Sequence, residues 1–137
     1  MRILALTALG AAALLAFAFG ARYVFTREFM PYQATVLGRP WSELDHRLQS
    51  VILGMLKVAG GGLLGYGVAL LWLLLPLHRG EAWAAWAALT MSLAALAPIL
   101  YTVVWLRRIE PSAKTPVIPS IAVLVLVVLG STIFLMD

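Results

Sequence analysis

Residues 50–75 form an apolar run of Leu, Val, Ile and Ala that contains one charged side chain, Lys57, and repeated glycines. A run of about 18 or more apolar residues is long enough to cross a bilayer as a helix. Glycine weakens a helix in water, but in lipid it lets a neighbouring helix backbone approach closely. This run therefore predicts a membrane-spanning helix with a surface for close packing.

Three further apolar runs, at residues 3–21, 82–106 and 117–136, complete a pattern of four. Charged residues make up only 12% of the chain, about half the share of roughly 25% that is usual in a soluble domain. The 137 residues leave room for four spans, but not for a further soluble domain of about 50 residues or more. We therefore predict an all-α fold, a polytopic membrane protein. Residues 1–137 would form a single domain, a four-transmembrane-helix bundle with an interfacial first loop at 22–47.

The first run follows Arg2 and resembles a secretory signal peptide. Because it is long enough to span a bilayer, we interpret it as the first transmembrane helix. Most basic residues flank the first and third connections: Arg22, Arg27, Arg39, Arg47, Arg107, Arg108 and Lys114. Only Arg2 and Arg79 flank the opposite side. Since basic loops stay in the cytoplasm, we predict a multi-pass protein of a bacterial inner membrane with both termini outside, although the signal-like start argues for the reverse orientation.

The first loop is too long to be a simple connection, since helices in a bundle are usually joined by about two to eight residues. It mixes charged side chains with aromatic ones, a composition typical of the headgroup layer. We expect an ordered interfacial cover over the mouth of the bundle, with Phe29 and Trp41 anchored among headgroups. Ser42 is expected to cap the second helix.

Glu43 and Arg47 lie four residues apart, so they would share one face of that helix. We expect both to face the bundle and to form the polar rim of a pocket. Asp45 and Gln49 would then face away.

Seven residues are candidates for a ligand site or pocket rim: Arg27, Glu28, Glu43, His46, Arg47, Lys57 and Tyr66. Lys57 is the one charged residue plausible within a span, which makes it a functional candidate. In the simpler interpretation it extends to lipid phosphates or pairs with Glu28, Glu43 or Glu110.

Gly54, Gly61, Gly65 and Ala69 fall on one stripe of the second helix. Small residues at this spacing favour helix packing, either within the bundle or between protomers. A substrate groove is the alternative interpretation of the same stripe.

No metal site, cofactor or nucleic-acid partner is predicted. Glu43 and His46 have the spacing of the Glu-x-x-His unit of di-metal bundles, but the spans supply no second unit. The chain has no cysteine, and its net charge of +4 is spread over the loops rather than gathered in a basic patch.

Four spans with long first and third loops resemble the layout of the eicosanoid and glutathione membrane-enzyme family. The second helix here has Arg47 and Gln49 without that family's Arg-rich, Asn-containing signature, and residues 117–136 contain neither Arg nor Tyr. Small multidrug exporters carry a membrane-embedded Glu in their first helix, which residues 3–21 lack. The sequence therefore assigns no family.

The leading functional hypothesis is a non-enzymatic binding protein or accessory subunit. Its partners would be membrane lipids, an apolar ligand, another membrane protein or a second copy in a homo-oligomer. The alternative is a membrane enzyme that acts on a lipid-soluble substrate at the headgroup level through the polar candidates above. A small transporter is the third hypothesis, weakened because no acidic residue lies within a span.

Overall fold

A computed structural model describes residues 1–137 and shows helices without strands. The four long helices are α1 (Arg2–Phe25), α3 (His46–His78), α4 (Ala82–Ile109) and α5 (Val117–Leu135). The first connection adds α2 (Pro31–Leu37) and a short 3-10 helix, η1 (Trp41–Glu43). Each long helix is long and apolar enough to cross a membrane. The predicted all-α membrane bundle of four spans is thereby confirmed.

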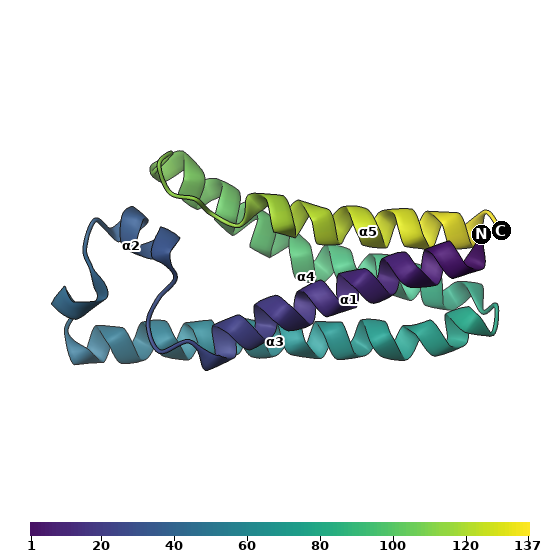
Figure 1. Ribbon diagram of the computed structural model, residues 1–137, viewed down its shortest axis with the longest axis horizontal. Coiled ribbons are helices and arrows are strands. Elements are labelled where there is room, and N and C mark those ends of the chain that lie inside the picture. Colours follow the sequence, from purple (N-terminus) through teal and green to yellow (C-terminus); the bar gives the residue numbers. More distant parts are fainter.

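The two ends of the bundle differ (Figure 1). Both chain termini and the turn between α3 and α4 lie at one end, the hairpin end. The splayed end holds the connections 26–45 and 110–116, and there α4 diverges from α3. The 33 residues of α3 span about 50 Å, against a hydrocarbon thickness of about 30 Å. Accordingly, α3 continues past the end of α1, with α2 beside this extension.

The second span starts and ends differently from the sequence expectation. Asp45, not Ser42, caps α3, because its carboxylate accepts hydrogen bonds from the backbone N–H groups of Arg47 and Leu48 at 2.9 and 3.1 Å. The helix also continues beyond residue 75, through Pro76 to His78. A proline removes only its own N–H bond, which a helix tolerates close to its end in a membrane protein. Gly80, with φ 87°, makes the turn.

The core is built around α1, which packs against both α3 and α5. Its buried positions are small or apolar and recur every three to four residues: Ala5, Leu9, Ala12, Ala13 and Ala16. Alanine leaves little space between backbones, so neighbouring helices can lie close to α1 along its length. The rest of the core comes from Leu70 and Leu77 of α3, alanines of α4 and Val123 and Val127 of α5.

Glycines mark the closest approaches between helices. A Cβ on Gly60 of α3 would lie 2.7 Å from the carbonyl oxygen of Gly20 on α1. A Cβ on Gly67 would meet the Phe17 ring at 2.9 Å, and one on Gly130 of α5 would lie 3.0 Å from the Ala5 carbonyl oxygen. A side chain at Gly60 would collide with the α1 backbone, and one at Gly67 or Gly130 would require neighbouring atoms to shift. The absence of a side chain lets the helices come into close van der Waals contact at these positions.

Side-chain contacts hold the first connection in order. Pro31 opens α2, where its missing N–H costs little, and the Gln33 side chain accepts a bond from the Met30 N–H at 2.7 Å. Phe29 packs edge-on against Trp41 with ring centroids 5.1 Å apart. Phe29 is only 6% exposed, so it is buried against Trp41; that this pair lies in the headgroup layer stays a prediction.

The outer surface of the long helices carries many large apolar side chains that nothing in the chain covers. Examples are Val58, Trp72, Trp83, Tyr101 and Ile118. A soluble protein rarely exposes so much contiguous apolar surface, whereas lipid tails cover it at no cost. The exterior therefore agrees with four helices embedded in a bilayer.

Candidate functional site

A cavity of about 570 Å³ lies between α1, α3, α4 and α5 in the splayed half of the bundle. Tyr32 and Gln33 of α2 line its end, and hydrophobic residues make up 15 of its 22 lining residues. Small residues explain why the space stays unfilled, because Ala16, Ala59 and Ala95 line it with a methyl group only. The volume lies within the range of about 300–1,000 Å³ that is usual for small-molecule sites.

The cavity opens sideways between α3 and α4. Six of its lining residues are also exposed at the surface: Met55, Ala59 and Gly62 on α3, and Ala94, Pro98 and Thr102 on α4. All six belong to segments long and apolar enough to cross a membrane. In a bilayer this opening would therefore face lipid, not water.

Tyr66 lies at the inner wall of the cavity, where α3 and α4 are still joined. Its hydroxyl lies 2.7 Å from the Ser92 hydroxyl, and Ser92 donates in turn to the Ala88 carbonyl oxygen at 2.5 Å. Tyr66 must therefore be the donor in its bond with Ser92. Both residues are buried, so this chain satisfies two hydroxyl groups that would be costly if left unpaired.

Two tyrosines face each other at the α2 end of the cavity. The hydroxyl groups of Tyr23 on α1 and Tyr32 on α2 are 3.0 Å apart. Gly60 lies so close to the end of α1 that an added Cβ would be 2.8 Å from the Tyr23 Cβ and from the Val24 nitrogen. Pro31 at the start of α2 restricts the backbone next to Tyr32. Burial, followed by the hydrogen bond with Tyr23, raises the pKa of Tyr32 above its ordinary value. Tyr32 therefore remains protonated and able to donate.

Of the seven candidates named from the sequence, only Tyr66 lines this cavity. The other six are exposed, and no ion pair joins any of them: Arg27, Glu28, Glu43, His46, Arg47 and Lys57. The structure therefore does not gather these charges around a pocket. Tyr23, Tyr32 and Gln33 line the polar end of the cavity instead, and sequence reasoning did not select them.

The expected face of Glu43 and Arg47 does not form. Glu43 belongs to η1, before the Asp45 cap, so the two residues do not share a helix. Gln49 does not face away either, since it is half-buried and its side chain donates to the Trp41 carbonyl oxygen at 2.9 Å. These expectations were wrong because they started the helix at Ser42.

Lys57 contacts the end of another helix. Its ammonium group donates to the carbonyl oxygen of Val24 at 2.9 Å. That carbonyl lies in the last turn of α1, where backbone acceptors lack helical partners and a positive charge is favoured. No carboxylate pairs with Lys57, so a backbone group takes the place of the glutamates considered from the sequence.

The stripe of small residues chosen from the sequence does not pack within the bundle. A Cβ on Gly54, Gly61 or Gly65 would meet nothing within 4 Å. Ala69 is half-buried and borders a groove at the hairpin end. Packing inside the bundle uses Gly60 and Gly67 instead. Packing of the exposed glycines against a second copy or another membrane protein stays a prediction.

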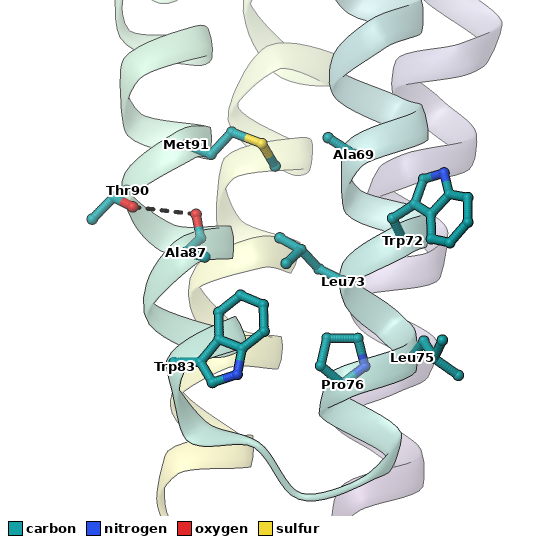
Figure 2. A pocket seen from close by; sticks show the side chains of 9 residues that line it. All are labelled: Ala69, Trp72, Leu73, Leu75, Pro76, Trp83, Ala87, Thr90 and Met91. Atoms are coloured by element: carbon teal, nitrogen blue, oxygen red, sulfur yellow. Dashed lines mark hydrogen bonds between the residues drawn. The ribbon is translucent and has the colours of Figure 1, made fainter.

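The groove at the hairpin end is a weaker candidate for a ligand site. It has a volume of about 780 Å³ and lies between α3 and α4, where Leu73 and Met91 extend toward each other (Figure 2). Trp72 and Leu75 point away from α4. The Thr90 hydroxyl donates to the carbonyl oxygens of Trp86 and Ala87 within its own helix, and seven of the nine lining residues are hydrophobic. Such a groove is suited to contact with lipid chains.

The cavity lining offers an apolar surface together with hydroxyl and amide groups. No charged side chain lines it, and no three His, Asp or Glu side chains lie together anywhere in the chain. General acid–base groups in proteins are most often histidine, and also carboxylates, lysine and tyrosine; of these the lining holds tyrosine only. The arrangement is therefore suited to holding an apolar molecule.

Comparisons with protein-family models, with curated proteins and with solved structures find no match to this chain.

Proposed function

We propose that this small membrane protein binds a lipid or another apolar molecule in the cavity at the splayed end of the bundle, without transforming it. The observation that carries the proposal is the sideways opening of an apolar cavity between two membrane helices. A molecule dissolved in the bilayer would reach such a cavity without crossing water. The cavity would then bury its apolar surface on several sides, which a single flat helix face cannot do.

Gly62 provides a direct test, because it lines the cavity and a Cβ there would meet nothing within 4 Å. Gly62→Leu should fill the mouth of the cavity without disturbing helix packing. Gly61→Leu is the matched control, since Gly61 also faces open space but does not line the cavity.

Native mass spectrometry of the protein purified in mild detergent would measure the lipid retained by each variant. We expect one retained molecule in the wild type and in Gly61→Leu, and at least a tenfold lower occupancy in Gly62→Leu. Equal occupancy in the two variants, or no retained molecule in the wild type, would reject the proposal.

The rival enzyme hypothesis has less support. It requires the polar candidates to converge on a cavity, as general acid–base chemistry needs groups within hydrogen-bond reach of the substrate. Arg27, Glu28, Glu43, His46 and Arg47 are exposed and outside the lining of the cavity. Binding therefore remains the function that the geometry supports best.

A further inference from the structure

The unused hydrogen-bond donors of the cavity gather at its α2 end. The Tyr23 and Tyr32 hydroxyls share one bond, so one of their two hydrogens remains free whichever group donates. Gln33 uses its carbonyl oxygen to accept from the Met30 N–H, which leaves its amide NH2 group available. Tyr23 of α1 and both Tyr32 and Gln33 of α2 line the cavity.

Every other hydroxyl that lines the cavity already donates to the protein. Thr102 donates to the Pro98 carbonyl oxygen at 2.8 Å, and Ser120 donates to that of Pro116 at 2.7 Å. Tyr66 donates to Ser92. A ligand therefore meets free donors at one end of the cavity and an apolar surface along the rest.

Charge is missing from the same surface. Lys57, the nearest basic residue along α3 to the lining residues Met55 and Ala59, gives its ammonium group to the Val24 carbonyl oxygen and does not line the cavity. A carboxylate or phosphate placed in the cavity would lose its hydration without gaining a countercharge, which is unfavourable. An uncharged oxygen that accepts hydrogen bonds loses far less hydration free energy on entering the cavity.

Resting on the proposed function, we propose that the ligand is a long-chain molecule whose polar end is an uncharged carbonyl oxygen. That oxygen lies between Tyr23, Tyr32 and Gln33, and the chain runs along the apolar walls toward Tyr66 and the opening. Two bilayer components share this chemistry, the ester carbonyl of a glycerolipid and the ring carbonyl of an isoprenoid quinone.

The test uses three photoreactive probes with the same saturated chain, ending in a methyl ketone, a carboxylate or a methyl group. Each is incorporated into vesicles of an ether-linked phosphatidylcholine, which has no carbonyl group, together with the protein, and labelling of the cavity is quantified by mass spectrometry. We expect the ketone to label about fivefold more strongly than the other two, the effect of a neutral hydrogen bond. Equal labelling by all three, or strongest labelling by the carboxylate, would overturn the proposal.

Two variants remove the donors while keeping the shape. The double variant Tyr23→Phe, Tyr32→Phe removes both hydroxyls and keeps both rings, so no hydroxyl is left unpaired. Gln33→Glu removes the amide hydrogens but keeps an oxygen for the Met30 N–H, and glutamate is favoured at this position of a helix start. Both variants should lose the ketone preference. Retention of the preference in both would overturn the assignment of these donors.

Gly62→Leu separates this inference from the proposed function. If all three probes label the wild type equally and all are lost in Gly62→Leu, the cavity binds apolar chains and only the carbonyl inference fails. If no probe labels the cavity of the wild type, both proposals fail. If a dioleoyl glycerolipid or an isoprenoid quinone competes with the ketone probe for labelling, the result supports the inference and identifies the source of the carbonyl. If neither lipid competes, the inference is overturned.

Discussion

The same two helices, α3 and α4, pack closely at the hairpin end of the bundle and diverge around a cavity at the splayed end. Toward the hairpin end, Leu73, Leu74 and Leu77 of α3 and Ala84, Ala85 and Ala88 of α4 belong to or pack against one continuous core. The Tyr66–Ser92 hydrogen bond is the one side-chain bond that joins α3 to α4. Beyond it, Pro98, Ile99 and Thr102 of α4 line the cavity. Small residues therefore close an interface where helices run together and leave a cavity where they diverge.

The connections at the two ends also differ, one being a tight turn and the other a longer segment. A tight turn at Gly80 joins α3 to α4 at the hairpin end, so these helices must start close together. At the splayed end, Glu110 fixes the turn after α4 by accepting bonds from the Ser112 hydroxyl and N–H at 2.6 and 3.1 Å. These bonds lower the pKa of the Glu110 carboxyl group. A longer, internally bonded connection permits the helix ends to stand apart.

The largest expected difference between the ends is the side of the membrane that each one faces. Most basic residues lie at the splayed end, which predicts that this end is cytoplasmic and that both termini are outside. Reporter fusions that are active only in the cytoplasm should therefore be silent at either terminus and active when inserted after Gly38. Strong activity from both terminal fusions would contradict this orientation.

The next largest effect should come from the closest helix contact. In Gly60→Ala the new Cβ would lie within 2.8 Å of three atoms of α1, two of them backbone atoms. Overpacking against backbone costs about 3 kcal/mol, which should lower the thermal unfolding temperature in detergent. Gly61→Ala, one residue away and facing open space, should be close to the wild type. Equal stability of the two variants would show that α1 and α3 do not meet at Gly60.

A smaller effect is expected where the closed interface gives way to the cavity. Ser92→Ala leaves the Tyr66 hydroxyl buried without a partner and should cost about 2 kcal/mol. Tyr66→Phe removes one bond while Ser92 keeps its bond to Ala88, so it should cost about 1 kcal/mol or less. Unfolding in detergent would measure both. A larger cost for Tyr66→Phe than for Ser92→Ala would contradict the direction assigned to this hydrogen bond.

The smallest effect should be that of Lys57. Lys57→Met keeps the apolar stem and loses the bond to the last turn of α1, which should cost about 0.5 kcal/mol because the site is exposed. Lys57→Arg should recover most of this free energy. A loss of several kcal/mol in Lys57→Met would instead point to a buried role for the ammonium group.

The architecture could be predicted from the sequence because run length and charge content alone decide how many helices can cross a bilayer. The face of α3 that turns inward could not be predicted in this way. Gly60 and Gly61 are neighbours flanked by similar apolar residues, and in lipid no contrast between polar and apolar faces indicates which one turns inward. The charged start at Glu43 and Arg47 was the only available guide, and it failed because Asp45 begins the helix after Glu43.

The cavity was harder to predict than the spans because its polar end joins distant parts of the chain. Tyr66 stood out as a hydroxyl within a glycine-rich span. Tyr23 and Tyr32 carry the typical signal of interfacial aromatics, and nothing local to either residue indicates that α2 folds back to bring their hydroxyls together. Such a contact depends on the path of the whole first connection.

The sideways opening between α3 and α4 also determines how occupancy should be described. A molecule that enters there comes from the surrounding leaflet, and its solubility in water does not limit the encounter. The relevant concentration is then its mole fraction among the lipids, and the encounter rate is set by two-dimensional diffusion. Titrations at several total lipid concentrations should therefore collapse onto one curve when occupancy is plotted against mole fraction, but not when it is plotted against bulk concentration.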